Sequence, residues 1–261
     1  RVLHQVALGL ERGADEAGVS IPGGEIAQVA DLLAPAGDMD EPMLDLVGTA
    51  IGGFPSEGDE LGPRNLLEGD AVSPGDVILG FPSSGLHSNG YSLARRVLFG
   101  LAGLTVEDPM PGRSKTPGRS KTIGDALLEP TRIYVGAVRD LWKAHVAMHG
   151  LVHISGGGLL NLTRLPAPVG YVIDRLPEAP PIFSLIQDTG ALPDTEMFAT
   201  LNMGVGLCVV VPSSDRDRAL EAGAAHGLAV LGHVTAEGER TVRIPERGLV
   251  GTGDAFSVEA R

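Results

Sequence analysis

The stretch that decides the fold runs from Phe81 to Leu93 and reads Phe-Pro-Ser-Ser-Gly-Leu-His-Ser-Asn-Gly-Tyr-Ser-Leu. The apolar run 77–80 before it predicts a short buried strand. After it, the apolar residues at 93, 94, 97 and 98 share one face of a helix. We therefore expect a loop that joins a strand to a helix, capped by Ser88 or Asn89, in a protein of the α/β class.

This loop is expected to offer hydrogen-bond donors to an anion. Backbone N–H groups and the helix dipole favour a phosphate at a strand-to-helix junction. Ser83, Ser84, Ser88 and Asn89 add neutral donors, and His87 adds a group that ordinarily titrates near pH 7. The alternative is a well-capped loop that binds nothing, and the residue types alone do not separate the two.

Composition narrows the range of partners. The formal net charge of −13, from 33 acidic and 20 basic side chains, opposes binding to nucleic acid or to an anionic membrane. The one cysteine, Cys208, lies in the apolar run 205–211 and is expected to be a buried strand residue, without a disulfide framework. No signal peptide or membrane-spanning run is evident in the sequence, so we expect a cytoplasmic location.

The first 71 residues are expected to be part of an N-terminal domain. Apolar residues recur at helical spacing from Leu3 to Ala17, and Gly18 ends the pattern. Segments 19–21 and 44–51 are expected to be strands, and 52–73 to be a connection rich in glycine and proline. Because the chain opens inside an amphipathic helix, we expect it to be truncated at its N-terminus.

Residues 72–261 are expected to form a C-terminal α/β domain. The patterns predict that strands and helices alternate, which is typical of a layered α/β or α+β domain. Strands are expected at 77–81, 151–154, 171–176, 206–211, 229–235 and 241–245, and helices at 89–99, 131–148, 181–188, 196–201 and 213–226, with a short one at 156–162. The tandem Pro-Gly-Arg-Ser-Lys-Thr at 111–122 lacks the Walker spacing and is expected to be a surface insertion.

The segment from Ser83 to Leu93 closely resembles the start of the C-terminal domain of the phosphoribosylformylglycinamidine cyclo-ligase family, also called aminoimidazole ribonucleotide synthetases. Four further segments resemble the same family in the same order. They are Gly23–Ala27, Leu127–Val135 (expected to be a helix), the glycine-rich loop His153–Leu159, and Glu196–Gly206.

The resemblance implies a reaction in purine biosynthesis. ATP activates the formyl oxygen of formylglycinamidine ribonucleotide, an internal nitrogen attacks, phosphate leaves, and the imidazole ring closes. It also implies Mg²⁺ on the nucleotide and a homodimer that pairs through its N-terminal domains.

The resemblance assigns roles to particular residues. His87 would transfer a proton or stabilise transferred charge, and Gly24 and Glu25 would bind the nucleotide, with Glu25 also a metal ligand. The substrate would be held by Ser83, Ser84, Gly85, Ser88, Asn89, Gly156, Gly157 and Gly158.

The chain departs from the family's pattern in two places. Gln28 stands where a carboxylate is expected, and the family's Asp-rich and Gly-rich ATP-binding segments lie upstream of Arg1. We therefore expect that this chain alone does not catalyse the reaction.

Two other functions remain open on the sequence. One is another ATP-dependent enzyme of the same fold group, such as a thiamine-monophosphate kinase, a selenophosphate synthetase or a hydrogenase-maturation dehydratase. The other is a non-catalytic paralogue that binds a ligand or dimerises.

Overall fold

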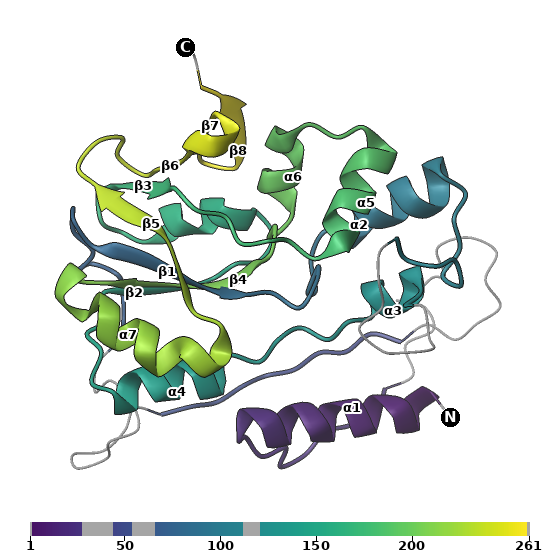
Figure 1. The fold of residues 1–261 in the computed structure, drawn as a ribbon. Coiled ribbons are helices and arrows are strands. Elements are labelled where there is room, and N and C mark those ends of the chain that lie inside the picture. Colours follow the sequence, from purple (N-terminus) through teal and green to yellow (C-terminus); the bar gives the residue numbers. More distant parts are fainter. Residues whose placement is uncertain (1, 28–43, 54–65, 112–120, 260–261) are drawn as a thin grey trace.

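The computed structural model describes residues 2–27, 44–53, 66–111 and 121–259. Within them, one mixed sheet of eight strands organises the chain (Figure 1). In spatial order the strands are β2 (Gly150–His153), β4 (Val205–Val211), β1 (Val77–Pro82), β5 (Ala229–Thr235), β3 (Gly170–Ile173), β6 (Thr241–Ile244), β7 (Leu249–Thr252) and β8 (Ala255–Val258). Neighbouring strands are antiparallel except β3 and β6, which are parallel.

Helices cover both faces of the sheet around β1 and β4. On one face, α4 (Val135–Lys143) and α7 (Arg216–Gly223) pack against Leu79 and Phe81 of β1 (Figure 1). All seven residues of β4 are buried, as expected for a strand covered on both sides. The expected α/β layering is therefore confirmed.

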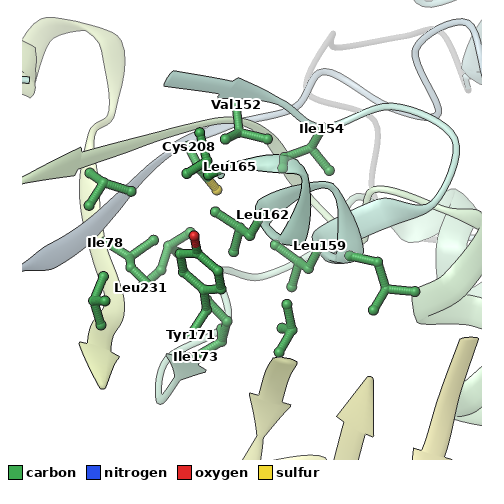
Figure 2. Packing of buried hydrophobic residues seen from close by; sticks show 14 of the residues in the cluster. Ile78, Val152, Ile154, Leu159, Leu162, Leu165, Tyr171, Ile173, Cys208 and Leu231 are labelled. Carbon is green, nitrogen blue, oxygen red and sulfur yellow. The ribbon is translucent and has the colours of Figure 1, made fainter. Parts of the chain in front are cut away.

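The other face is covered by the 3₁₀ helix η2 (Gly158–Arg164) and by α6 (Asp194–Thr200). Figure 2 shows Leu159 and Leu162 of η2 gathered with Tyr171 and Cys208 of the sheet. Cys208 is a free, fully buried thiol, as the sequence predicts, and burial raises its pKa to about 12.

A third apolar cluster lies beside the sheet. It joins α2 (Tyr91–Arg95), the π-helix η1 (Arg96–Leu101), α3 (Ile123–Leu127) and α5 (Pro181–Gly190). Leu86, from the loop after β1, is buried in this cluster and so anchors that loop.

The helix expected at the N-terminus is confirmed as α1 (Val2–Ala17), with Gly18 at φ 67° after it. The strands expected at 19–21 and 44–51 are wrong. Neither segment pairs with another strand in the part of the chain that the structure describes, and a strand needs such a partner for its backbone groups.

The remaining short helices are η3 (Ser213–Asp215), η4 (Ala224–His226) and η5 (Pro245–Arg247).

Several expected boundaries are also wrong. The helix expected at 131–148 is α4 alone, because residues 128–134 are non-helical and His145 has a φ of 53°. The helix predicted over Leu127–Val135 is wrong for the same reason, since residues 128–134 are non-helical. Strands β7 and β8 were not anticipated from the pattern. Gln28 and most of the tandem repeat at 111–122 lie outside the described residues.

Candidate functional site

Three loops meet at one edge of the sheet. Loop 83–90 follows the C-terminal end of β1, segment 154–157 follows the C-terminal end of β2, and segment 201–204 precedes β4. Because β4 runs antiparallel to both neighbours, Pro82 pairs with Val205 and His153 pairs with Leu207. The topology thus brings together three of the segments singled out in the sequence.

Asn202 ties two of these loops together. Its side chain is only 3% exposed, and its amide nitrogen donates to the carbonyls of Gly85 and Leu86, at 2.9 and 3.2 Å. Its Oδ1 accepts from the Ser83 hydroxyl at 2.8 Å and from the Gly204 N–H at 3.0 Å. Asn202 therefore holds the shape of loop 83–90, and Ser83, expected to contact substrate, is engaged inside the protein.

His87 lies at the centre of the loop in an unusual backbone conformation, with a φ of 60°. Its side chain is 3% exposed, and its Nε2 accepts a hydrogen bond from the Ser84 N–H at 3.1 Å. Burial, followed by the nearby charges of His153 and Arg132, lowers the His87 pKa to about 4. The expectation that His87 titrates near pH 7 is therefore wrong, because the desolvated imidazole stays neutral.

The tautomer of His87 follows from this hydrogen bond. A neutral imidazole whose Nε2 accepts carries its proton on Nδ1. That Nδ1 is buried and has no hydrogen-bond partner among the described residues. Such an unpaired donor is costly unless something pairs with it when the site is in use.

Two further aromatic side chains surround His87. The His153 ring lies parallel to it with centroids 6.4 Å apart, and the Tyr134 ring lies 6.2 Å away. The Tyr134 hydroxyl donates to the Pro82 carbonyl at 2.9 Å, and burial raises its pKa. Gly206 faces this group, since a Cβ there would meet the Tyr134 oxygen at 1.8 Å.

Residues 130–132 hold the outer side of the loop. The Ser84 hydroxyl donates to the Pro130 carbonyl at 2.6 Å, and the hydroxyls of Ser88 and Thr131 lie 3.0 Å apart. Arg132 donates to the carbonyls of Pro82 and His226. The Ser84 side chain is therefore also engaged within the protein, whereas Ser88 is exposed and Asn89 is half-buried.

The prediction that Ser88 or Asn89 caps the following helix is wrong. The N-cap residue of α2 is Gly90, at φ 78°, and no side chain caps the helix. The N–H groups of Ser83 and Ser84 are also occupied, by the Gly204 carbonyl and by His87. An anion at this loop would therefore meet fewer free N–H groups than the sequence predicts.

The glycine-rich loop lies opposite Asn89. A Cβ on Gly156 would lie 3.2 Å from the Asn89 Oδ1, so the two loops approach closely. Gly157 has a φ of 100°. Gly158 is buried, and a Cβ there would meet the Phe198 carbonyl at 2.2 Å, so its place in the fold is explained by packing. Gly85, within loop 83–90, is likewise buried.

Gly24 and Glu25 are exposed and lie in a segment without regular structure. No hydrogen bond or ion pair joins them to loop 83–90 in the part of the chain that the structure describes. Across residues 2–27, 44–53, 66–111 and 121–259, no group of three or more His, Cys, Asp or Glu side chains is arranged to hold a metal. Glu25 by itself supplies one carboxylate, which Mg²⁺ would supplement with nucleotide phosphates and water.

Sequence reasoning did not single out Asn202, Tyr134, Arg132 or His153 as site residues. Asn202, Tyr134 and Arg132 lie in segments that resemble the family, but their hydrogen bonds reach across 50 to 119 positions of sequence. His153 was expected to pack, yet it is exposed at the end of β2. The pairing of β2 with β4 places His153, and long-range hydrogen bonds place the other three, so no local pattern reveals their position.

Comparison with known proteins gives consistent matches. The family described as AIR synthase related protein, C-terminal domain, matches residues 73–245. The chain is 43% identical over 219 residues to a phosphoribosylformylglycinamidine cyclo-ligase of Methanothermobacter thermautotrophicus, covering 84% of this chain and 58% of that protein. The same-named protein of Methanobrevibacter smithii is 38% identical over 241 residues, covering 92% and 65%.

A solved structure of a HypE–HypF complex aligns with a TM-score of 0.43 and 20% identity, covering 74% of this chain and 55% of that one. No helix in the described part of the chain is both long and apolar enough to span a membrane. The chain spans about three-fifths of the length of the curated relatives it matches.

Proposed function

The chain belongs to the AIR synthase related protein family, and from that premise we propose that it is the substrate-binding part of a phosphoribosylformylglycinamidine cyclo-ligase. The proposed reaction is the ATP-dependent closure of formylglycinamidine ribonucleotide to aminoimidazole ribonucleotide in purine biosynthesis. ATP would supply the phosphoryl group that turns the formyl oxygen into a leaving group.

The observation that carries this proposal is the meeting of loop 83–90, the glycine-rich loop and segment 201–204 at one sheet edge. These are the segments whose sequences resemble the family. The proposed substrate contacts are Ser88, Asn89 and Gly156, which the structure leaves accessible or half-buried. Ser83, Ser84, Gly85 and Gly158 instead hold the loops in place.

His87 has a different role in this proposal from the one first expected. A neutral imidazole with its proton on Nδ1 acts as a hydrogen-bond donor to an oxygen, and it does not accept a proton at neutral pH. Because Nδ1 is buried, a small movement of the loop would have to accompany binding. His87 would then help to hold the reacting amide oxygen or its phosphorylated form.

Gly24 and Glu25 remain the proposed nucleotide-binding residues, with Glu25 as a metal ligand. No hydrogen bond or ion pair among the described residues joins them to His87. The domain division at 71/72, a homodimer and a cytoplasmic location likewise stay predictions.

Isothermal titration calorimetry of this chain with formylglycinamidine ribonucleotide tests the proposal. We expect saturable binding that Asn89→Ala weakens about tenfold, the usual effect of one lost hydrogen bond to a polar ligand. Ser92→Ala, an exposed change on the adjacent helix, is the matched control and leaves the affinity unchanged. A folded chain that does not bind this nucleotide would contradict the proposal for this chain.

The alternatives are separated by ligand identity. Binding of thiamine monophosphate, and not of formylglycinamidine ribonucleotide, would identify another enzyme of the same fold group. Product formation by the full-length protein excludes a non-catalytic paralogue.

A further inference from the structure

A polar groove lies away from the loops described above. It has a volume of about 430 Å³ and is lined by Val77, Asp174, Arg175, Arg216, Val230, Leu231, Gly232 and His233. This volume is within the range of pockets that hold small ligands. None of these residues belongs to loop 83–90, the glycine-rich loop or segment 201–204.

A β-bulge aims His233 into this groove. Val77 of β1 pairs with His233, and Leu79 pairs with Val230, so three residues of β1 span four residues of β5. Residues three apart on a strand normally point to opposite faces, but the extra residue places Val230 and His233 on the same one. Bulges of this kind commonly re-aim a side chain next to a functional site.

The bulge depends on a glycine. A Cβ on Gly232 would lie 1.8 Å from the Val172 carbonyl oxygen, so any larger residue would push β5 away from β3. The bulged arrangement is therefore built into the centre of the sheet, where β5 lies between β1 and β3.

The exposed imidazole of His233 is held by a carboxylate. His233 Nδ1 and Asp174 Oδ2 are 2.9 Å apart, and Asp174 directly follows the end of the neighbouring strand β3. With Nδ1 engaged by the carboxylate, Nε2 is the ring nitrogen left for a ligand.

Two arginines supply the positive charge of the groove. No carboxylate among the described residues lies within ion-pair distance of Arg175. Arg216, the first residue of α7, has only the weak pair with its neighbour Asp217, at 3.8 Å, and the Asp217 side chain is 91% exposed. In a chain with a net charge of −13, two arginines and a histidine face one groove that contains a single carboxylate.

We propose that this groove binds a small phosphate monoester, with Arg175, Arg216 and the Asp174-held His233 contacting the phosphate and the apolar floor contacting the rest of the ligand. Guanidinium groups match phosphate oxygens in geometry and charge. Free phosphate would contact the cationic side chains but leave Val77 and Val230 uncovered. The ligand is therefore a phosphorylated molecule about the size of a pentose phosphate.

Calorimetry of the full chain with ribose 5-phosphate tests this site. We expect saturable binding, weakened about tenfold by Arg175→Gln or by Arg216→Gln and abolished by the double variant, since each removes a charge-assisted hydrogen bond. Arg139→Gln, an exposed loss of charge on the neighbouring helix α4, is the matched control and retains the wild-type affinity. Circular dichroism verifies that each variant is folded.

Two further ligands and one variant locate the site. Ribose without phosphate is expected not to bind, and inorganic phosphate to bind more weakly than ribose 5-phosphate. Asn89→Ala is expected to leave ribose 5-phosphate binding unchanged, which separates this groove from the proposed substrate site. No binding by the wild-type chain, wild-type affinity in the double arginine variant, equal affinity for inorganic phosphate, or loss of binding in Asn89→Ala would each overturn the proposal.

Discussion

His87 shows how one hydrogen bond can decide the chemistry of a residue. Its Nε2 accepts from the Ser84 N–H, and burial lowers its pKa from 6.5 to about 4. In the unfolded chain the imidazole takes up a proton near pH 6.5, but in the folded chain it does not. The unfolded state therefore binds more protons between these values, and stability falls as the pH drops from 6.5 towards 4.

This gives the first prediction. Between pH 7 and pH 5, His87 is expected to cost the wild-type protein about 2 kcal/mol of unfolding free energy. His87→Gln, whose side-chain oxygen can still accept from Ser84, removes that contribution. Urea unfolding of both proteins at the two pH values measures the difference. If both lose the same stability, His87 is not held neutral by the fold.

Two buried tyrosines are expected to respond in opposite ways to loss of their hydroxyl. The Tyr171 side chain is fully buried, and its hydroxyl has no hydrogen-bond partner in the described part of the chain, whereas Tyr134 donates to Pro82. Tyr171→Phe should raise the free energy of unfolding by about 1 kcal/mol, and Tyr134→Phe should lower it by about 1 kcal/mol. Urea unfolding tests both, and destabilisation by Tyr171→Phe would indicate an unseen partner.

Gly206 is fixed by the same aromatic group. A Cβ there would lie 1.8 Å from the Tyr134 hydroxyl and 2.7 Å from the His87 Cε1. Gly206→Ala is expected to cost about 3 kcal/mol, as overpacking does in a dense core. Since Tyr134→Phe removes the nearest clashing atom, the double variant should be about 1 kcal/mol more stable than additivity predicts. Strict additivity in urea unfolding would show that the clash lies elsewhere.

At the scale of elements, Asn202 joins the segment before β4 to the loop after β1. Asn202→Ala would leave buried groups of Ser83, Gly85, Leu86 and Gly204 without their partner. The expected loss of stability is about 4 kcal/mol, against about 1 kcal/mol for Ser83→Ala, which removes only one of these bonds. Amide hydrogen exchange in residues 83–90 should rise more in Asn202→Ala. Equal effects of the two variants would contradict this role.

Local sequence patterns predicted the elements that lie around the core but not the contacts between them. The runs of β1 and β4 are apolar at strand length, so their burial is evident in the sequence. The π-helix η1 follows α2 without a break in the apolar pattern, so period alone does not reveal it. The N-cap of α2 was also predicted wrongly, because Gly90 begins the helix in a left-handed backbone conformation and no side chain caps it.

The sequence predicted the place of loop 83–90 in the fold but not the hydrogen bonds that its side chains make. Loop 83–90 lies where the strand-to-helix pattern places it. The use of Ser83, Ser84 and His87 within the protein depends on Asn202, Pro130 and the strand pairing, which are distant in sequence. The prediction of strands at 19–21 and 44–51 was wrong for a related reason. A local sequence pattern does not show whether a neighbouring strand is present to pair with the backbone.

For the molecule as a whole, α1 is distinct from the core. None of its residues is buried, and the side chains of Leu3 and Leu10, which lie on one helical face, are each 50% exposed. Leu98, by contrast, is fully buried in the cluster beside the sheet. An apolar stripe left open on a helix commonly marks a surface that associates with another protein.

The last prediction follows from that contrast. The double variant Leu3→Gln and Leu10→Gln should change the free energy of unfolding by less than about 1 kcal/mol, because exposed positions contribute little to stability. Leu98→Ala, the buried control, should cost about 3 kcal/mol. If the stripe of α1 contributes to the predicted homodimer, sedimentation velocity will show weaker self-association in the double variant than in the wild type. A large loss of stability in the double variant would mean that α1 packs on the core in solution, and an unchanged sedimentation profile would remove the stripe from the dimer surface.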